Sequence, residues 1–163
     1  MKQTVRVLGI DPGTLKLGYA VIECQPGKLG PGAMRYLECG VIKAPKIREI
    51  GPRLHAIAQE LDTVIAEFTP KTCAIEKAFH GTNARSALTL GQARGALMLL
   101  AHQRGMDTFE YAPAHIKRVV AGHGAADKTQ IAERVRMLFG LRRAPAADAA
   151  DALAIACCHA LAR

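Results

Sequence analysis

The alternation of apolar and polar positions predicts strands in the first third of the chain. Apolar runs bounded by turn residues indicate three strands, from Val5 to Asp11, from Gly18 to Cys24 and from Tyr36 to Ile42. Only the short turn at residues 12–16 separates the first two strands. Short connections between neighbouring strands favour an antiparallel meander. The first third therefore predicts three antiparallel strands.

Helical spacing dominates the middle of the chain. One predicted helix ends at Pro70, because the residue before a proline avoids the helical region. A second helix starts near Asn83 and runs through Leu100, between two short strands at Thr72 to Glu76 and Thr108 to Tyr111. The apolar face of the first helix consists of Leu54, Ile57, Leu61, Val64 and Phe68.

The last third is basic at first and then strongly apolar. A polar, basic segment from His115 to Arg143 contains a predicted helix from about Lys128 to Phe139. The final helix, from about Ala147 to Leu161, consists almost entirely of Ala, Leu, Ile and Cys, so we expect it to be buried nearly all round. The resulting element order predicts an α/β fold, a mixed sheet layered with helices. We expect residues 1–163 to form a single domain.

Composition narrows the class of protein. Half of the 163 residues are hydrophobic, which supports a packed core and excludes an intrinsically disordered chain. No apolar run approaches the roughly 20 residues of a membrane span. The five cysteines form no CxxC pair and predict reduced thiols in a cytoplasmic protein.

The charge balance favours a polyanionic partner. Lys and Arg outnumber Asp and Glu by 22 to 14, a net charge of +8. Residues 117–143 are rich in Lys and Arg, and residues 77–106 contain no acid but carry Lys77, Arg85, Arg94 and Arg104. Such runs are usually solvated faces, but these two also suit contacts with phosphates. Aromatic residues make up only 4% of the chain, so few rings are available to contact bases.

Four acids occupy positions where a carboxylate is costly. Asp11 and Glu76 end predicted strands, and Asp148 and Asp151 share one face of the apolar last helix. An isolated buried charge is strongly unfavourable, and no lysine or arginine lies near the two aspartates on their helix. The four carboxylates therefore predict divalent cations, and all-oxygen ligands select Mg²⁺ or Mn²⁺.

Each acid taken singly has a plain structural explanation. Asp11 suits a turn, Glu76 suits a surface strand end, and Asp148 suits the first turn of a helix. Asp151 is harder to explain in this way, because it adds a second acid to an alanine-rich face. The combination favours two Mg²⁺ ions, bridged by Asp11, and in-line hydrolysis of a phosphodiester by water.

Five segments, in order along the chain, resemble the RuvC family of Holliday junction resolvases. The most specific are LGQARG at Leu90 to Gly95 and ADAADALA at Ala147 to Ala154. The other three are GIDPGT at Gly9 to Thr14, AIE at Ala74 to Glu76, and Asn83 with Ser86 to Leu88. Together the matches cover essentially the whole chain.

The resemblance implies a ribonuclease-H-like fold with a five-stranded mixed sheet flanked by helices. It implies a homodimeric, Mg²⁺-dependent crossover junction endodeoxyribonuclease of recombination and repair, with two ions per site and Mn²⁺ as a substitute. Such an enzyme makes paired, symmetric nicks in four-way DNA junctions and leaves 5′-phosphate and 3′-hydroxyl ends. A branch-migration complex is the further partner that the resemblance implies. The family's metal ligands correspond to Asp11, Glu76, Asp148 and Asp151.

The resemblance also implies DNA contacts. Phe79 matches an aromatic ring that stacks on or wedges between bases at the crossover, although it also suits a packed loop anchor. Lys117 and Lys128 match two family lysines near the scissile phosphate, and either could polarise it or assist the attacking water. We expect three further contacts close to the Phe79 loop, from Thr82, Asn83 and Arg85.

Several points stay open at the level of sequence. The chain has Asp127 where the family pattern has Glu, and a long Gly- and Pro-rich loop from Gln25 to Arg35. Gly91 and Gly95 share a helix face that suits either close packing on the sheet or a subunit contact. Another ribonuclease-H-like nuclease, a transposase-like enzyme or a non-catalytic relative are alternatives. An actin-like ATPase shares a similar Asp-x-Gly-Thr turn but needs about twice this length.

Overall fold

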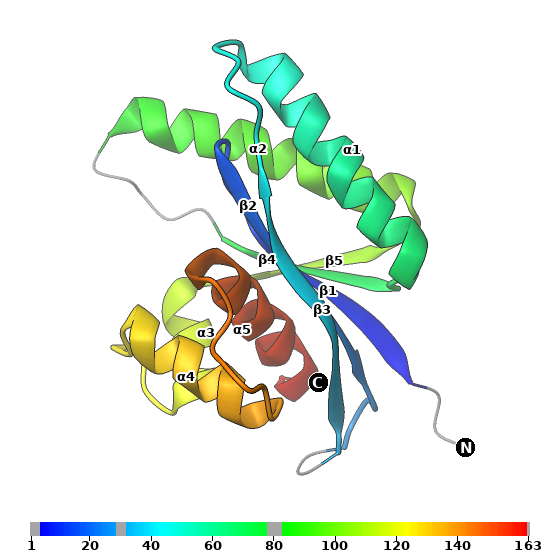
Figure 1. Cartoon of the computed structure of the whole chain (residues 1–163), viewed down its shortest axis with the longest axis vertical. Helices are drawn as coiled ribbons and strands as arrows, with labels where there is room; N and C mark the ends of the chain where they lie inside the picture. Colours follow the sequence, from blue (N-terminus) through cyan, green and yellow to red (C-terminus); the bar gives the residue numbers. More distant parts are fainter. Residues whose placement is uncertain (1–3, 29–31, 78–82, 163) are drawn as a thin grey trace.

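The fold is a five-stranded mixed sheet with helices on both faces (Figure 1). The computed structural model describes residues 4–28, 32–77 and 83–162. The strands are β1 (Val5–Asp11), β2 (Lys16–Cys24), β3 (Met34–Lys43), β4 (Thr72–Glu76) and β5 (Asp107–Tyr111). The helices are α1 (Ile50–Phe68), α2 (Ala84–Gln103), α3 (Pro113–Ala121), α4 (Lys128–Leu138) and α5 (Ala147–Leu161). No helix in the described ranges is long and apolar enough to cross a membrane.

The strand order is β3-β2-β1-β4-β5, with β1 at the centre. The strands β1, β2 and β3 form the predicted antiparallel meander, and β4 and β5 run parallel to β1. The α/β fold class and the five-stranded mixed sheet are therefore confirmed. Because β1 and β4 are parallel neighbours, their carboxyl ends lie at the same edge of the sheet.

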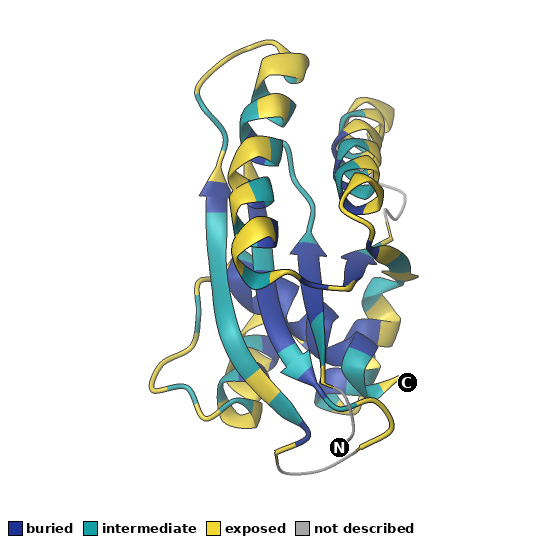
Figure 2. Cartoon of the chain, turned by 90° about the vertical axis from the view of Figure 1, so that its right-hand side faces the viewer, coloured by how far each residue is buried: buried dark blue, intermediate teal, exposed yellow. Residues whose placement is uncertain are grey.

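Alternate residues of the central strands serve two separate cores. Val7 of β1 packs in the core beneath α3, α4 and α5, whereas Leu8 and Ile10 pack in the core beneath α1 and α2. The two-residue period of a strand therefore turns Gly9 and Asp11 toward α5. Figure 2 shows that burial is deepest in the sheet and α5, while α1 and α2 expose much of their outer surface.

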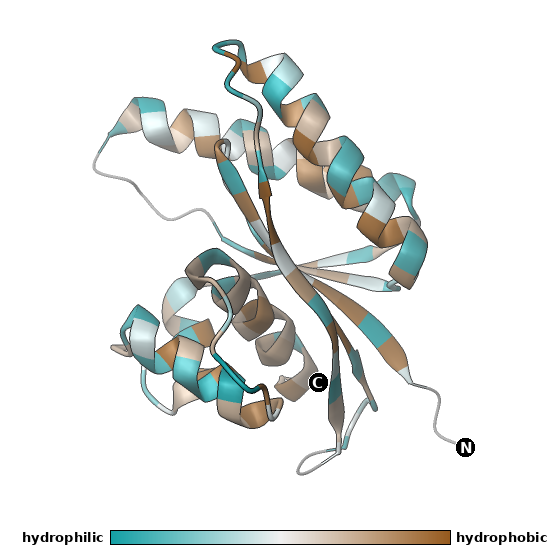
Figure 3. Cartoon of the chain, in the orientation of Figure 1, coloured by the Kyte–Doolittle hydropathy of each residue, from teal (hydrophilic) through white to brown (hydrophobic). Residues whose placement is uncertain are grey.

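Helix α5 is the most buried helix, as its composition predicts. Ten of its residues are buried, whereas α1 and α4 alternate polar and apolar positions (Figure 3). Two glycines of the sheet let α5 approach closely. A Cβ on Gly9 would lie 2.2 Å from the Ala152 carbonyl oxygen, and one on Gly18 would lie 2.0 Å from the Asp148 carbonyl oxygen. The helix backbone therefore rests directly on β1 and β2.

Two features differ from the sequence-based prediction. Helix α3 was not predicted, because it is short, begins with Pro113 and buries only Ile116 and Val120 within a polar segment. Strands β2 and β3 begin at Lys16 and Met34, two residues before the predicted starts, because their ladder continues into residues next to the turn and loop sequence. Hydrophobic periodicity carries little signal in a polar segment or over two residues at the end of a strand.

Candidate active site

The ends of two parallel strands bring the first two acids to one side of the sheet. Ile10 pairs with Ile75 across β1 and β4, so Asp11 and Glu76 are the next residues of their strands. Glu76 follows Ala74 by one pleat, and Ala74 packs in the core beneath α5. Both acids therefore face α5, as the strand period requires.

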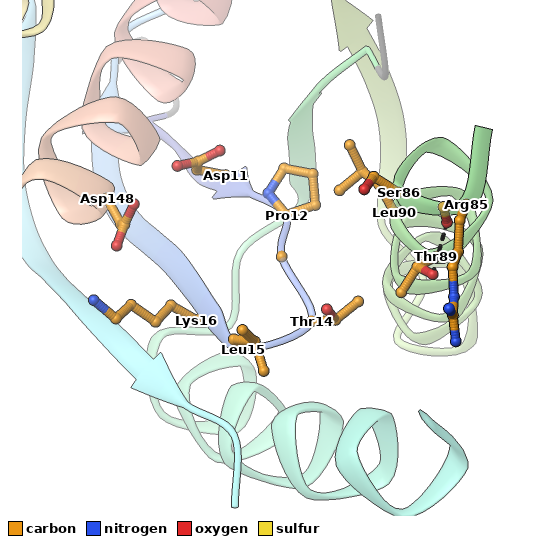
Figure 4. Close-up of a pocket in the computed structure, with 11 residues that line it drawn as sticks. Asp11, Pro12, Thr14, Leu15, Lys16, Arg85, Ser86, Thr89, Leu90 and Asp148 are labelled. Carbon is orange, nitrogen blue, oxygen red and sulfur yellow. Dashed lines mark hydrogen bonds between the residues drawn. The ribbon is translucent and has the colours of Figure 1, made fainter. Parts of the chain in front are cut away.

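Helix α5 supplies the other two acids. Carboxylate oxygens of Asp11, Asp148 and Asp151 lie within 4.8 Å of one another, and all three side chains are half-buried. Figure 4 shows Asp11 and Asp148 on the same wall of a cavity of about 740 Å³. The close contact of α5 with Gly18 holds this helix against the end of β1. The three aspartates predicted from the sequence as ligands thus meet at distances that suit a shared cation.

Glu76 lies beside this cluster, outside the group of three. It lines a second cavity, of about 270 Å³, together with Asp11, Asp151, Lys117 and Lys128. Asp11 borders both cavities, whereas Asp148 borders only the larger and Asp151 only the smaller. Asp11 therefore lies between the other three acids, with Asp148 at the larger cavity and Glu76 and Asp151 at the smaller one.

Burial and mutual repulsion raise the pKa values of the cluster. Burial first, and then the charges of Asp151, Glu76 and Asp148, together raise the pKa of Asp11 to about 7. Burial is also the main cause that raises the pKa of Glu76 and of Asp151. A divalent cation would relieve this repulsion, and the donor set consists of carboxylate oxygens. The site therefore fits a hard cation such as Mg²⁺ or Mn²⁺.

One cation does lie beside the acids, which corrects the prediction that they have no cationic partner. Lys128 Nζ lies 3.4 Å from Asp151 Oδ2, and Asp151 is the main cause that raises the pKa of Lys128. Lys128 is the first residue of α4, where the helix dipole disfavours a positive charge. The sequence around Asp151 gives no sign of this pair, because Lys128 lies on a different helix, 23 residues earlier in the chain.

Asp127 explains the departure from the family pattern before Lys128. Its Oδ1 accepts from the Gln130 backbone N–H at 2.8 Å, and the Gln130 side chain accepts from the Asp127 N–H at 2.9 Å. This capping box begins α4, and aspartate caps a helix better than the longer glutamate does. The cap fixes the backbone that carries Lys128.

The remaining candidate contacts surround the two cavities. Lys117 of α3 lines the smaller cavity, and Arg85 of α2 lines the larger one. Asn83 caps α2, because its side-chain oxygen accepts from the Arg85 backbone N–H at 2.9 Å. Phe79 and Thr82 lie outside the described residues.

Two arginines of the acid-free segment 77–106 form ion pairs with acids outside that segment. Arg94 donates from Nε to the Glu76 carbonyl oxygen at 3.0 Å and forms an ion pair with Glu110. Arg104 forms an ion pair with Asp62. These ion pairs do not test the prediction that residues 77–106 contact phosphates, which stays a prediction. Arg94 fixes the end of β4. It is the arginine of the LGQARG motif, which is the sequence feature that draws attention to this residue.

Gly91 and Gly95 do not pack on the sheet. A Cβ on either would meet nothing within 4 Å in the described structure, so that alternative is wrong. Leu88 and Leu99 lie on the same helix face, with exposed fractions of 67% and 60%. Within the described residues, this face of α2 therefore exposes Leu88, Gly91, Gly95 and Leu99.

Comparisons with known proteins agree with the motifs. The family model described as "Crossover junction endodeoxyribonuclease RuvC" matches residues 7–159. The protein of that name from Chloroflexus aggregans is 43% identical over 157 residues, which cover 96% of this chain and 93% of the relative. The protein of that name from Halorhodospira halophila is 44% identical over 155 residues, which cover 95% of this chain and 89% of the relative.

Solved structures show the same relationship in three dimensions. The Thermus thermophilus RuvC structure matches with a TM-score of 0.82 at 35% identity and covers 96% of this chain and 94% of that one. T. thermophilus RuvC in complex with Holliday junction substrate matches with a TM-score of 0.86 at 34% identity and covers 97% and 94%. The yeast mitochondrial Holliday junction resolvase Ydc2 shares the fold, with a TM-score of 0.64 at 15% identity and 94% and 77% covered. The chain therefore belongs to the RuvC family of crossover junction endodeoxyribonucleases.

Proposed function

We propose that this crossover junction endodeoxyribonuclease cuts four-way DNA junctions with divalent ions held by Asp11, Glu76, Asp148 and Asp151. The observation that carries the proposal is the meeting of three carboxylates within 4.8 Å at the end of β1, with Glu76 beside them. A family relative has been solved with Holliday junction substrate, which supports the choice of DNA substrate.

The arrangement around Asp11 supports two ions. Asp11 borders one cavity with Asp148 and the other with Glu76 and Asp151, so it is the residue that would bridge a pair of ions. Mg²⁺ is the ion that all-oxygen ligands favour, and Mn²⁺ shares that preference. Bound there, divalent ions supply Lewis acidity at the scissile phosphodiester.

The lysines of the smaller cavity complete the site. Lys117 of α3 and Lys128 of α4 line this cavity together with Glu76 and Asp151. We expect their ammonium groups to contact phosphate oxygens and orient the scissile group, while the carboxylates bind cations. Replacing Lys117 with Ala should therefore slow cleavage at saturating enzyme more than it weakens junction binding. Equal losses of rate and affinity would make Lys117 a binding residue only.

The other expected contacts and the setting of the enzyme belong to the same proposal. The whole chain, residues 1–163, would act as a single nuclease domain in the cytoplasm. Phe79 and Thr82, with Asn83 and Arg85 at the start of α2, would contact the junction near its crossover. A branch-migration complex would be its further partner.

A homodimer through α2 would provide the second cut. Symmetric cleavage of a junction needs two sites, whereas the described part of this chain contains one cluster of carboxylates that could hold metal. The open face of α2, with Leu88, Gly91, Gly95 and Leu99, suits close contact with a second copy.

Solution mass measurements test this interface. Replacing Leu88 and Leu99 with Asp should convert a dimer into a monomer in light scattering. Met137→Asp on α4 is the matched control, because its 60% exposed fraction equals that of Leu99. A monomeric wild-type protein, or a double variant that stays dimeric, would contradict the interface on α2.

Incubation with a synthetic four-way junction and a duplex of matched sequence tests the activity directly. We expect paired nicks in the junction alone, with ligatable 5′-phosphate ends, in Mg²⁺ and in Mn²⁺ but not with chelator. Equal cleavage of the duplex would favour a general nuclease of the same fold. Cleavage that survives the chelator would overturn the assignment of the carboxylates to metal.

A further inference from the structure

A strongly basic cavity lies where the β1–β2 turn meets the connection between β3 and α1. Its volume is about 510 Å³, and its described lining includes five cations and no acid. Apart from the cations, the wall consists of the apolar residues Leu15, Ala44, Pro45 and Ile47. The five cations are Lys16, Lys43, Lys46, Arg48 and Arg53.

These cations have no carboxylate partners in the described ranges. None of them takes part in the ion pairs found there, which involve other lysines and arginines. Lys16 and Lys43 are direct cross-strand partners, so two like charges face each other on the same side of the sheet. Arg53 adds a buried Nε with no hydrogen-bond partner in the described structure. Both arrangements are unfavourable unless an anion binds there.

The basic cavity continues from the cavity that contains the catalytic aspartates. Leu15 and Lys16 line both cavities. Asp11 pairs with Gly18 on β2, and Lys16 lies two residues earlier on the same strand, about 7 Å farther along it. Figure 4 shows Lys16 on the side of Asp148 and Leu15 at the tip of the turn. A polyanion bound at the carboxylates would therefore reach the basic cavity within a short distance.

We propose that Lys16, Lys43, Lys46, Arg48 and Arg53 form a second phosphate-binding surface that holds the DNA backbone outside the cleavage site. The inference rests on the proposed function for its substrate, and it adds a place where a junction arm is held. The lining contains cations and aliphatic groups but no aromatic ring, so the contact is with phosphates and is independent of base sequence. Its contribution is affinity and orientation of the arm, while the chemistry stays at the carboxylates.

The test removes two exposed charges from this surface and two from the other end of the sheet. The variant Lys46→Gln/Arg48→Gln changes only exposed side chains, so folding should be unaffected. The matched control is Lys28→Gln/Lys71→Gln, which removes the same charge. Lys28 follows β2, whose last residue pairs with Val5, and the Lys71 N–H donates to the Arg6 carbonyl oxygen. Both control residues therefore lie at the start of β1, far from Asp11.

Junction affinity is then measured as a function of salt, and cleavage is measured at saturating enzyme in Mg²⁺. We expect Lys46→Gln/Arg48→Gln to weaken junction binding by about tenfold or more near 0.1 M salt. The slope of log affinity against log salt should fall by about 2, since each lost phosphate contact contributes about 0.9. The saturating cleavage rate should match that of the wild type, and the control variant should keep both affinity and slope.

Other outcomes would overturn the inference. Equal losses in the two double variants would show an effect of net charge alone. Unchanged junction binding together with lost binding to vesicles of anionic lipid would assign the surface to membranes. A wild-type protein that binds no junction contradicts the proposed function itself, whereas a wild type that binds and cuts beside an unchanged variant contradicts only this surface.

Discussion

The two faces of the sheet are packed by different means. On one face, α5 lies backbone against backbone on β1 and β2, through Gly9 and Gly18. On the other face, α1 and α2 pack through large side chains such as Leu61 and Leu97. All four proposed metal ligands lie on the first face. The proposed chemistry therefore lies on the face where helix and sheet are in direct backbone contact.

Backbone contact positions ligands more tightly than side-chain packing does. Long aliphatic side chains can change rotamer and absorb small shifts of a helix, whereas a carbonyl oxygen against a Cα cannot. Metal sites require ligand distances held to within about 0.2 Å. Glycine and alanine on the α5 face therefore serve the geometry of the site as well as the stability of the core.

The largest effect is expected from removing one proposed metal ligand on the face of the sheet that α5 covers. Asp148→Asn should lower the junction cleavage rate on the order of 10³-fold or more, because it removes a carboxylate charge from the cation site. Junction binding in the presence of chelator should stay close to that of the wild type. Asp107→Asn, at the start of β5, is the matched control. Near-normal cleavage by Asp148→Asn would show that the site works without this ligand.

A second experiment breaks the backbone contact itself. Gly18→Ala places a methyl group against the Asp148 carbonyl oxygen, so α5 must move. We expect a loss of roughly 3 kcal/mol in the free energy of unfolding, measured with urea, and slower cleavage by the folded protein. Gly51→Ala on α1 meets nothing within 4 Å and should leave stability equal or higher by up to about 1 kcal/mol. Equal effects at the two glycines would remove the distinction between the faces.

The pH dependence of the metal-free protein gives a third, smaller effect. The pKa of Asp11 is about 7 in the folded chain, against 3.8 for a free aspartate. The folded state therefore binds more protons between these values, and stability falls as the pH rises from about 4 to 7. In chelator, the wild type should melt roughly 5 °C lower at pH 8 than at pH 5.

The variant Asp11→Asn isolates the source of this dependence. It should flatten much of the pH profile and melt higher than the wild type at pH 8 in chelator. Added Mg²⁺ should raise the melting temperature of the wild type at pH 8 more than that of the variant. A wild-type melting temperature that rises between pH 5 and pH 8 in chelator would contradict the raised pKa of Asp11.

The smallest effect concerns the cap that supports Lys128. Asp127→Ala removes the capping box of α4 and should cost about 1 kcal/mol in the free energy of unfolding. Cleavage should slow by less than tenfold, because Lys128 itself remains. Asp127→Asn keeps an acceptor at the same position and should behave like the wild type. A cleavage loss as large as that of Asp148→Asn would give Asp127 a direct part in the chemistry.

The sequence predicted the fold well where apolar periodicity is strong. Strands β1 and β4 and helix α5 have the predicted bounds, because each is apolar between clear turn or polar residues. Helix α3 was missed because two buried residues in a polar stretch leave almost no periodic signal. Its neighbour α4 was predicted because Ile131 and Val135 lie between charged residues at helical spacing.

The candidate site could be predicted where the local sequence around a residue is unusual. Each acid alone has a plain structural explanation, but acids at two strand ends together with a pair on an alanine-rich helix are unusual, so all four candidates could be named from the sequence. Two ion pairs could not be predicted in this way, because each joins elements that are separate in sequence. They are Lys128 with Asp151 and Arg94 with Glu110. Such partners are set by the packing of helices against the sheet, which no spacing along the chain reveals.

The strand period that turns Asp11 toward α5 also restricts how the gene for this chain can change length. A codon inserted into β1 between Val7 and Asp11 would turn Asp11 to the face of α1 and α2. The same holds for β4 ahead of Glu76. A change of length outside these strands leaves the alternation within them intact. Within β1 and β4, substitutions can keep Asp11 and Glu76 on the face toward α5, whereas the insertion or deletion of one residue cannot.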